Sequence, residues 1–133
     1  MTYFQPPGYV HVMNHATWAD VTVQATQSAG PAALPFAAQL AAAGGKTLVL
    51  RVVNAAAGAQ PVSVALAAGA AAGPSYTLWT LGGAAYATTD DNSPGRPTFI
   101  APVQAQPAIA PGATTIAFTL EPHTYAIAVV TLQ

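Results

Sequence analysis

The apolar residues near the start of the chain follow a helical period. Pro6 opens the segment PPGYVHVMNHATWAD, in which apolar side chains recur at the spacing i, i+3, i+4 and i+7. The recurring residues are Tyr9, Val12, Met13 and Ala16. Because prolines are tolerated in the first turn of a helix, the pattern predicts one short helix with an apolar face. We expect it to end near Asp20, where DVTVQAT changes to a period of two.

Beyond residue 20 the pattern predicts strands separated by glycine and proline turns. LPFAAQLAAAGGKTLVLRVVN contains two strand-like runs joined at Gly44 and Gly45, a dipeptide suited to the positive φ of a tight hairpin. SYTLWTLGG adds another run, and TYAIAVVTL is apolar on both faces, as expected of a central strand in a two-layer core. In three runs, alternate apolar residues share a face: Leu48, Leu50 and Val52; Val62, Val64 and Leu66; Ile116, Phe118 and Leu120.

The stretch DDNSPGRPTFIAPV contains three prolines and a glycine, which predicts an extended crossing loop and not a ladder strand. Short strands separated by such turns indicate an all-β fold, an antiparallel β-sandwich with one short N-terminal helix. We expect residues 1–19 to form the helical segment and residues 20–133 to form the sandwich. A chain of 133 residues is one domain of ordinary size.

Composition changes this picture mainly through charge. Apolar residues make up 53% of the chain, enough for a real core, but only 5% of residues are charged, where ordinary domains carry about a quarter. Three basic residues cannot build a phosphate-binding patch or a polybasic membrane contact, so neither nucleic acid nor membrane is an expected partner. The absence of cysteine removes disulfides and thiolate chemistry. So uncharged a surface predicts that part of it lies against a partner.

The acids of this chain do not form a convincing catalytic pair. Catalysis by a general acid and a second carboxylate needs two acidic side chains that converge on one substrate. The acids are Asp20, Asp90, Asp91 and Glu121. Adjacent side chains on an extended chain point to opposite faces, so Asp90 and Asp91 do not converge. The serines Ser28, Ser63, Ser75 and Ser93 lack the context of a nucleophile elbow, and no catalytic residue is predicted.

Glu121 stands close to His123 and Tyr125 in LEPHTYAIAVVTLQ, which raises the possibility of a catalytic cluster. The residue before a proline favours an extended or turn conformation, and Pro122 follows Glu121. We therefore interpret EPHT as the hairpin between the last two strands, with Thr124 or His123 bonded to local backbone.

Two histidines and four aromatic residues offer other chemistry. His11 and His15 are four residues apart, so a helix places both on one face, the spacing of helical zinc pairs. Zinc needs a third protein ligand, and the sequence offers no glutamate or cysteine beside them, so no metal or cofactor site is predicted. The aromatic residues Trp18, Tyr76, Trp79 and Tyr86 could stack against sugars, but core or interdomain packing is the favoured interpretation.

Four stretches, in order, resemble the C-terminal region of the α-L-arabinofuranosidases of glycoside hydrolase family fifty-one. TYFQPPGYVHVM resembles the segment that follows the last strand of the catalytic barrel in that family. KTLVLRVVN is similar to the strand ending in Asn that starts the sandwich, and DDNSPGRPTFIAPV to a proline-spaced loop. LEPHTYAIAVVTL is similar to the final Pro-His-Ser/Thr turn and last strand.

The resemblance implies a jelly-roll-like β-sandwich appended to a (β/α)8 barrel that removes terminal arabinofuranosyl groups from arabinan or arabinoxylan. The family's two catalytic glutamates lie on the barrel, and no position here matches them. The hypothesis is therefore a non-catalytic accessory domain that packs on a barrel, or forms a homo-oligomer, through its apolar helix and sheet face. The alternative is an independent carbohydrate-binding or structural module. Without a barrel, we expect the helix face bearing Tyr9, Val12 and Met13 to be buried internally or in a homodimer.

Overall fold

The computed structural model describes residues 3–28, 34–87 and 89–133. It contains one helix and eight strands in this part of the chain. The elements are α1 (Pro6–Ala16), β1 (Val21–Thr22), β2 (Phe36–Leu40), β3 (Thr47–Asn54), β4 (Gln60–Ala65), β5 (Ala72–Gly82), β6 (Val103–Ala105), β7 (Thr115–Leu120) and β8 (Thr124–Leu132). Within these ranges, no helix is long and apolar enough to cross a membrane.

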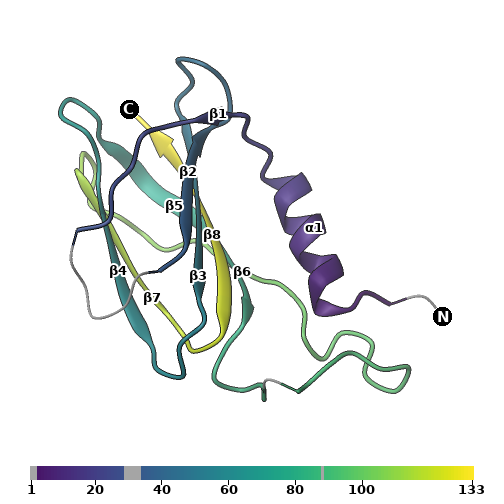
Figure 1. Ribbon diagram of the computed structural model, residues 1–133. Helices are drawn as coiled ribbons and strands as arrows, with labels where there is room; N and C mark the ends of the chain where they lie inside the picture. Colours follow the sequence, from purple (N-terminus) through teal and green to yellow (C-terminus); the bar gives the residue numbers. More distant parts are fainter. Residues whose placement is uncertain (1–2, 29–33, 88) are drawn as a thin grey trace.

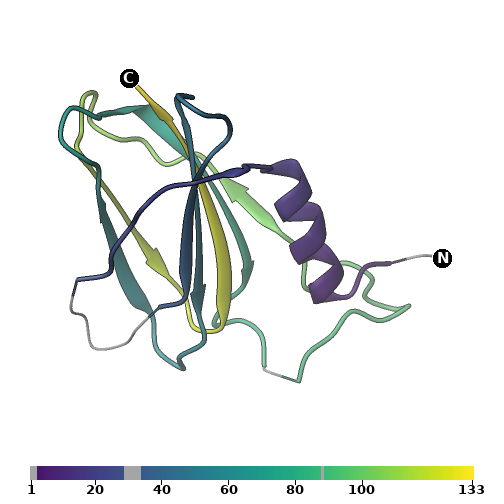
Figure 2. The same cartoon turned by 45° about the horizontal axis from the view of Figure 1, so that its top comes forward.

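The strands form two antiparallel sheets, which confirms the all-β sandwich (Figure 1). One sheet has six strands in the order β1-β2-β3-β8-β5-β6, and the other pairs β4 with β7. Strand β8 lies between β3 and β5 and has buried residues on both faces, as predicted for TYAIAVVTL. The turned view shows α1 on the side of the six-stranded sheet opposite to β4 and β7 (Figure 2).

The hairpin predicted around two glycines is confirmed. Strands β2 and β3 pair in antiparallel register from Phe36–Val52 to Leu40–Leu48. Gly44 has φ 68°, a conformation that glycine adopts without steric cost. The preceding run DVTVQAT contributes only the two residues of β1, at the edge of the sheet.

The prediction that EPHT is a hairpin between paired strands is wrong. The segment is a turn, and the hydroxyl of Thr124 donates to the carbonyl oxygen of Pro122 (3.2 Å). However, β7 and β8 belong to different sheets, so the turn carries the chain from one layer to the other. The crossing is tight, because a Cβ at Gly82 would lie 2.2 Å from the carbonyl oxygen of His123. His123 has φ 51°.

The helix forms as predicted but ends at Ala16, before the expected boundary near Asp20. The backbone N–H of Thr17 donates to the carbonyl oxygen of Met13 (3.0 Å), and the Thr17 hydroxyl donates to the same atom (2.7 Å). The buried face also differs from the prediction. Met13 is fully buried, but Val12 is 41% exposed and Ala16 is exposed.

The strand register explains why α1 buries Met13 and leaves Val12 exposed. Val49, Arg51 and Val53 share the outer face of β3, opposite to Val129, Ile127 and Tyr125 of β8. This face is part apolar and part polar. Tyr9, Val10 and Met13 pack against its apolar part, and the polar Asn14 meets its polar part. The helix therefore presents Asn14, and not Val12, to the sheet.

The core has two layers on either side of the six-stranded sheet. Between the sheets, Leu48, Leu50, Tyr76, Ile116 and Val130 form an apolar cluster. On the outer side, Met13, Val49, Leu81, Ile100 and Ile127 form a second cluster beneath α1. The main layer of the fold is thus covered on one side by strands and on the other by the helix.

Candidate functional site

The seam between α1 and the sheet contains a half-buried arginine with neutral partners. Nε of Arg51 donates to Oδ1 of Asn14 (2.9 Å), and Nη2 donates to the carbonyl oxygen of Thr17 (2.8 Å). Nη1 donates to Oε1 of Gln39. Because one guanidinium joins β3 to β2, to α1 and to the residue after α1, it fixes the helix on the sheet with charge-assisted hydrogen bonds.

Tyr125 extends this network from β8. Its hydroxyl donates to Oδ1 of Asn14 (2.7 Å), the same atom that accepts from Arg51. Burial raises the pKa of the Tyr125 phenol above its ordinary value, and the positive charge of Arg51 and the hydrogen bond with Asn14 oppose this effect. The neutral phenol is therefore the form that this seam holds at physiological pH.

The loop between β5 and β6 ties the N-terminal segment to the sandwich. Nδ2 of Asn92 donates to the carbonyl oxygens of Phe4 (2.7 Å) and Ile100 (2.8 Å), and Oδ1 accepts from the N–H of Ile100 (2.7 Å). Nε2 of Gln5 donates to the carbonyl oxygen of Asn92 (2.8 Å). Asn92 is buried, and its bonds hold the chain in place just before α1 begins.

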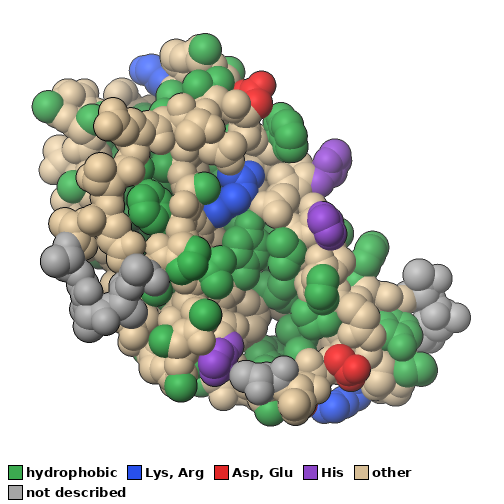
Figure 3. All heavy atoms as spheres, viewed as in Figure 1, with side chains coloured by type: hydrophobic (Ala, Val, Ile, Leu, Met, Phe, Trp, Pro, Cys, Tyr) green, Lys and Arg blue, Asp and Glu red, His purple; other side chains and the backbone are tan. Residues whose placement is uncertain are grey.

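A groove of about 610 Å³ runs between the first half of α1, the ends of β3, β5 and β8, and the loop after β5. Its walls are mainly apolar. They include Val10, Leu81, Tyr86, Ile100 and Tyr125. Figure 3 shows hydrophobic side chains gathered in the hollow beside the helix. The groove follows the line where the helical segment meets the sandwich.

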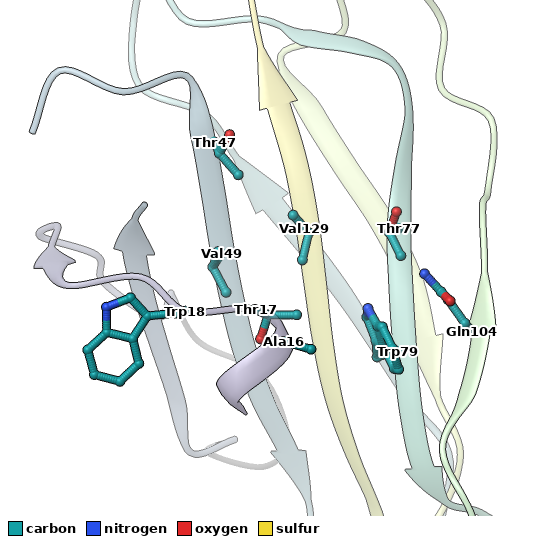
Figure 4. Close-up of a pocket in the computed structure, with 9 residues that line it drawn as sticks. All are labelled: Ala16, Thr17, Trp18, Thr47, Val49, Thr77, Trp79, Gln104 and Val129. Carbon is teal, nitrogen blue, oxygen red and sulfur yellow. The ribbon is translucent and has the colours of Figure 1, made fainter. Parts of the chain in front are cut away.

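A smaller concavity of about 280 Å³ lies at the other end of α1, on the outer face of the sheet (Figure 4). It is lined by Ala16, Thr17, Trp18, Thr47, Val49, Thr77, Trp79, Gln104 and Val129. None of these lining residues is charged. The helix end and strands β3, β8, β5 and β6 all contribute to it.

The four acidic residues do not lie together in the structure. Asp20, Asp91 and Glu121 are exposed, and Glu121 stands at the turn between layers. Asp90 lines the groove, and its Oδ2 accepts from the N–H of Ala87 (2.8 Å), so this carboxylate holds a loop turn. Asp90 is the one acid among the described lining residues of the groove, and a two-carboxylate mechanism needs a second.

The histidines lie apart from any such pair. His11 and His15 are both exposed on α1. His11 also lines the groove, as does His123 from the layer-crossing turn. In residues 3–28, 34–87 and 89–133, no three His, Cys, Asp or Glu side chains are close enough to hold a metal ion.

The four aromatic residues do not come together as one platform. Tyr76 is buried between the sheets, with its hydroxyl bonded to the carbonyl oxygen of Ala117 (3.3 Å), so its core interpretation is confirmed. Tyr86 packs edge-on against Phe99 beside the groove. Trp18 and Trp79 both line the concavity, but Figure 4 shows the ring of Trp18 directed away from the other side chains.

Sequence reasoning missed the seam residues. Arg51 interrupts an otherwise apolar strand, and a cation at an alternate position of LVLRVV was the available signal that this face meets polar partners. Nothing local marked Asn14 or Tyr125 as its neighbours, because they lie 37 and 111 residues from their partners in the chain. Asn92 stood in the loop that carried the family resemblance, but its contacts with Phe4 and Gln5 are long-range as well.

No protein-family model matches the sequence, and no curated protein matches it significantly. Solved structures do match. An arabinose-bound MgGH51 α-L-arabinofuranosidase aligns with 98% of this chain at a TM-score of 0.82 and 17% identity. The α-L-arabinofuranosidase from Thermotoga maritima in its arabinose complex aligns with 74% (TM-score 0.61, 21% identity). The GH51 arabinofuranosidase from Xanthomonas axonopodis pv. citri aligns with 83% (TM-score 0.60, 18% identity).

The chain spans only about a fifth of the length of these enzymes, with coverages of 20%, 19% and 21%. The similarity therefore lies in the fold of one region, and it includes α1 as well as the sandwich in the alignment that covers 98% of the chain. The resemblance seen in the four sequence stretches is confirmed at the level of fold. The chain has the architecture of one part of a GH51 α-L-arabinofuranosidase.

Proposed function

We propose that this chain is a non-catalytic accessory β-sandwich of an α-L-arabinofuranosidase-like glycoside hydrolase. In this role residues 20–133 form the accessory domain, and residues 1–19 form the helical segment that ends the catalytic (β/α)8 barrel. The parent activity is the removal of terminal arabinofuranosyl groups, carried out by two glutamates on that barrel. The sandwich braces the barrel and takes no part in bond cleavage.

The observation that carries the proposal is that the N-terminal segment has both buried and exposed apolar side chains. Met13 and its neighbours are buried against the sandwich. Three other apolar residues of the segment face solvent, since Phe4 is 52% exposed, Val12 41% and Trp18 71%. Five large hydrophobic residues are exposed in the described chain, and these three all fall within residues 3–18. Exposed apolar residues that gather on one segment mark a surface that contacts a partner.

The polar contacts support the same role. Arg51 and Asn92 anchor the two ends of the helical segment on the sandwich, so the segment is held in one orientation before any partner arrives. A preorganised surface loses less entropy on docking than a mobile one. The exposed Phe4, Val12 and Trp18 are thus presented as a fixed set.

The test joins the chain to a GH51 catalytic barrel, or supplies that barrel in trans, and measures association and the thermal stability of the barrel's activity. Val12→Asp and Trp18→Asp should weaken association about tenfold or more, since each places a charge in an apolar contact. Ser63→Asp is the matched control, because Ser63 is exposed on β4 in the opposite layer. Its effect should be small.

Two results would contradict the proposal. One is equal weakening by Ser63→Asp, which would remove any special part for the helical segment. The other is turnover of an aryl α-L-arabinofuranoside by the purified chain alone, lost in the Glu121→Gln variant. That result would make the chain an enzyme in its own right.

A further inference from the structure

The concavity at the C-terminal end of α1 has a feature that packing against a catalytic barrel does not require. One of its lining residues is a tryptophan whose position is fixed by both neighbouring strands. Trp79 pairs in register with Ile127 of β8 and with Gln104 of β6. Its ring is half-buried on the outer face of the sheet, and one flat side faces the hollow (Figure 4). An indole held on paired strands is a rigid stacking surface.

Free polar groups line the same concavity as this ring. Gln104 lies directly across from Trp79, and Thr77 stands on the same face two residues earlier in β5. Within the described chain, the side-chain amide of Gln104 and the hydroxyls of Thr77 and Thr47 have no hydrogen-bond partner in the protein and remain open to solvent. They supply hydrogen-bond donors and acceptors in the concavity that contains the apolar face of the Trp79 ring.

Charge and size restrict what fits. The lining contains no charged side chain, so it offers nothing to attract an ionic ligand. At about 30 Å³ for each water in the liquid, a hollow of 280 Å³ has room for a single sugar ring but not for a chain of them. It is slightly smaller than the roughly 300–1,000 Å³ typical of sites for drug-sized molecules.

We propose that the Trp79 concavity binds one neutral sugar residue of an oligosaccharide or polysaccharide. The apolar C–H face of the sugar stacks on Trp79, and its hydroxyls bond to Gln104 and Thr77. The open side leaves room for the rest of the glycan to continue into solvent. This binding site shares Trp18 with the docking surface proposed above, whose other members Phe4 and Val12 are not among its lining residues.

A protein surface is the competing occupant. An apolar protein surface would cover the face of the Trp79 ring. It would also remove water from the Gln104 amide and the Thr77 hydroxyl without replacing their hydrogen bonds. Each buried polar group left unpaired costs about 1–3 kcal/mol. A sugar replaces those bonds with its own hydroxyls, so the mixture of one aromatic face and several free polar groups favours a glycan over a protein side chain.

The experiment is a titration of the ¹⁵N-labelled chain, followed by NMR, with oligosaccharides from arabinan, from arabinoxylan and from cellulose. The expected Kd for a one-ring site is about 1–10 mM. The indole N–H of Trp79 and the side-chain amide of Gln104 should shift together, and the indole N–H of Trp18 should not. The three glycans distinguish a preference for pentose from one for hexose, and binding of any one with a Kd in this range supports the site.

Substitutions separate stacking from structure. Trp79→Ala should weaken binding about tenfold, and Gln104→Ala about threefold, in proportion to a lost ring contact and a lost hydrogen bond. Gln104 is exposed, so that variant tests the site even if Trp79→Ala folds poorly. Phe36→Ala is the control, because Phe36 is an aromatic residue 43% exposed on β2 that does not line the concavity, and its Kd should equal that of the wild type. No shift with any of the three glycans, or equal loss in Phe36→Ala and Trp79→Ala, would overturn the proposal.

Discussion

The two faces of the central strands β3, β8 and β5 differ in what covers them. The inner face packs against β4 and β7 through apolar residues such as Leu50, Val130 and Ile116. The outer face is covered by one helix and is mixed. It has an apolar patch around Ile127, a polar seam around Arg51, and two open hollows beside them.

This difference separates stability from interaction. A fully apolar layer between two sheets gains the most from burial and leaves no group for a partner. The outer face uses some of its positions for directional polar bonds, which fix where α1 lies and leave its far side exposed. The inner layer supplies most of the stability of the fold, and the outer layer positions α1 and its exposed side chains for contact with a partner.

The strongest test of the difference between the two layers is to truncate one buried side chain of similar size in each. Ile116→Ala, in the inner layer, should lower the free energy of unfolding by about 2–5 kcal/mol. The paired strands around the cavity are held in place by their hydrogen bonds, so they cannot move in to fill it. Met13→Ala should cost about 2 kcal/mol, the low end of that range, because Met13 belongs to a helix packed on the outside of the sheet and not to a paired strand. Urea denaturation measures both. Hydrogen exchange should show that Met13→Ala loosens α1 alone, and loss of protection in β8 in that variant would contradict the separation.

The polar seam can be tested by removing its cation. Arg51→Leu removes the donor to Gln39 and to the carbonyl oxygen of Thr17, while Asn14 keeps its bond from Tyr125, so it should lower the free energy of unfolding by about 1–2 kcal/mol. Lys46→Leu is the control, because Lys46 is exposed near the β2–β3 hairpin and should change stability by less than about 0.5 kcal/mol. Equal effects from the two substitutions would mean that charge, and not the seam, is responsible.

The smallest effect is expected at alkaline pH, where one tyrosine on each face titrates. Burial raises the pKa of Tyr76 and of Tyr125 above the ordinary 10.0, and for Tyr125 the charge of Arg51 opposes the shift. Above that value the unfolded chain releases protons that the folded chain still holds, so stability is complete below it and falls as pH rises through the folded pKa.

Tyr76→Phe and Tyr125→Phe should therefore each flatten the decline of stability above pH 10.0, because each removes a phenol whose pKa burial raises. Urea denaturation at stepped alkaline pH measures the slope. Identical slopes in both variants and the wild type would show that neither buried phenol governs alkaline unfolding.

Much of the fold followed from local pattern. Period-two alternation correctly grouped Leu48 with Leu50 and Ile116 with Leu120, and the two glycines correctly marked the hairpin between β2 and β3. The helix was found, but its buried face was not, because that face depends on the polar seam of a strand more than thirty residues away. The last turn was recognised as a turn, yet the sheet to which each flanking strand belongs is a long-range property.

The sequence by itself determined which residues alternate, where the chain turns, and how few of its residues are charged. These are local properties, because side-chain direction along a strand or helix depends only on neighbouring residues. Only the tertiary structure decided which layer covers each face, which way the ring of Trp18 points, and that Trp79 and Gln104 stand side by side. Those outcomes depend on packing between segments far apart in the chain, and no short window of sequence contains both partners.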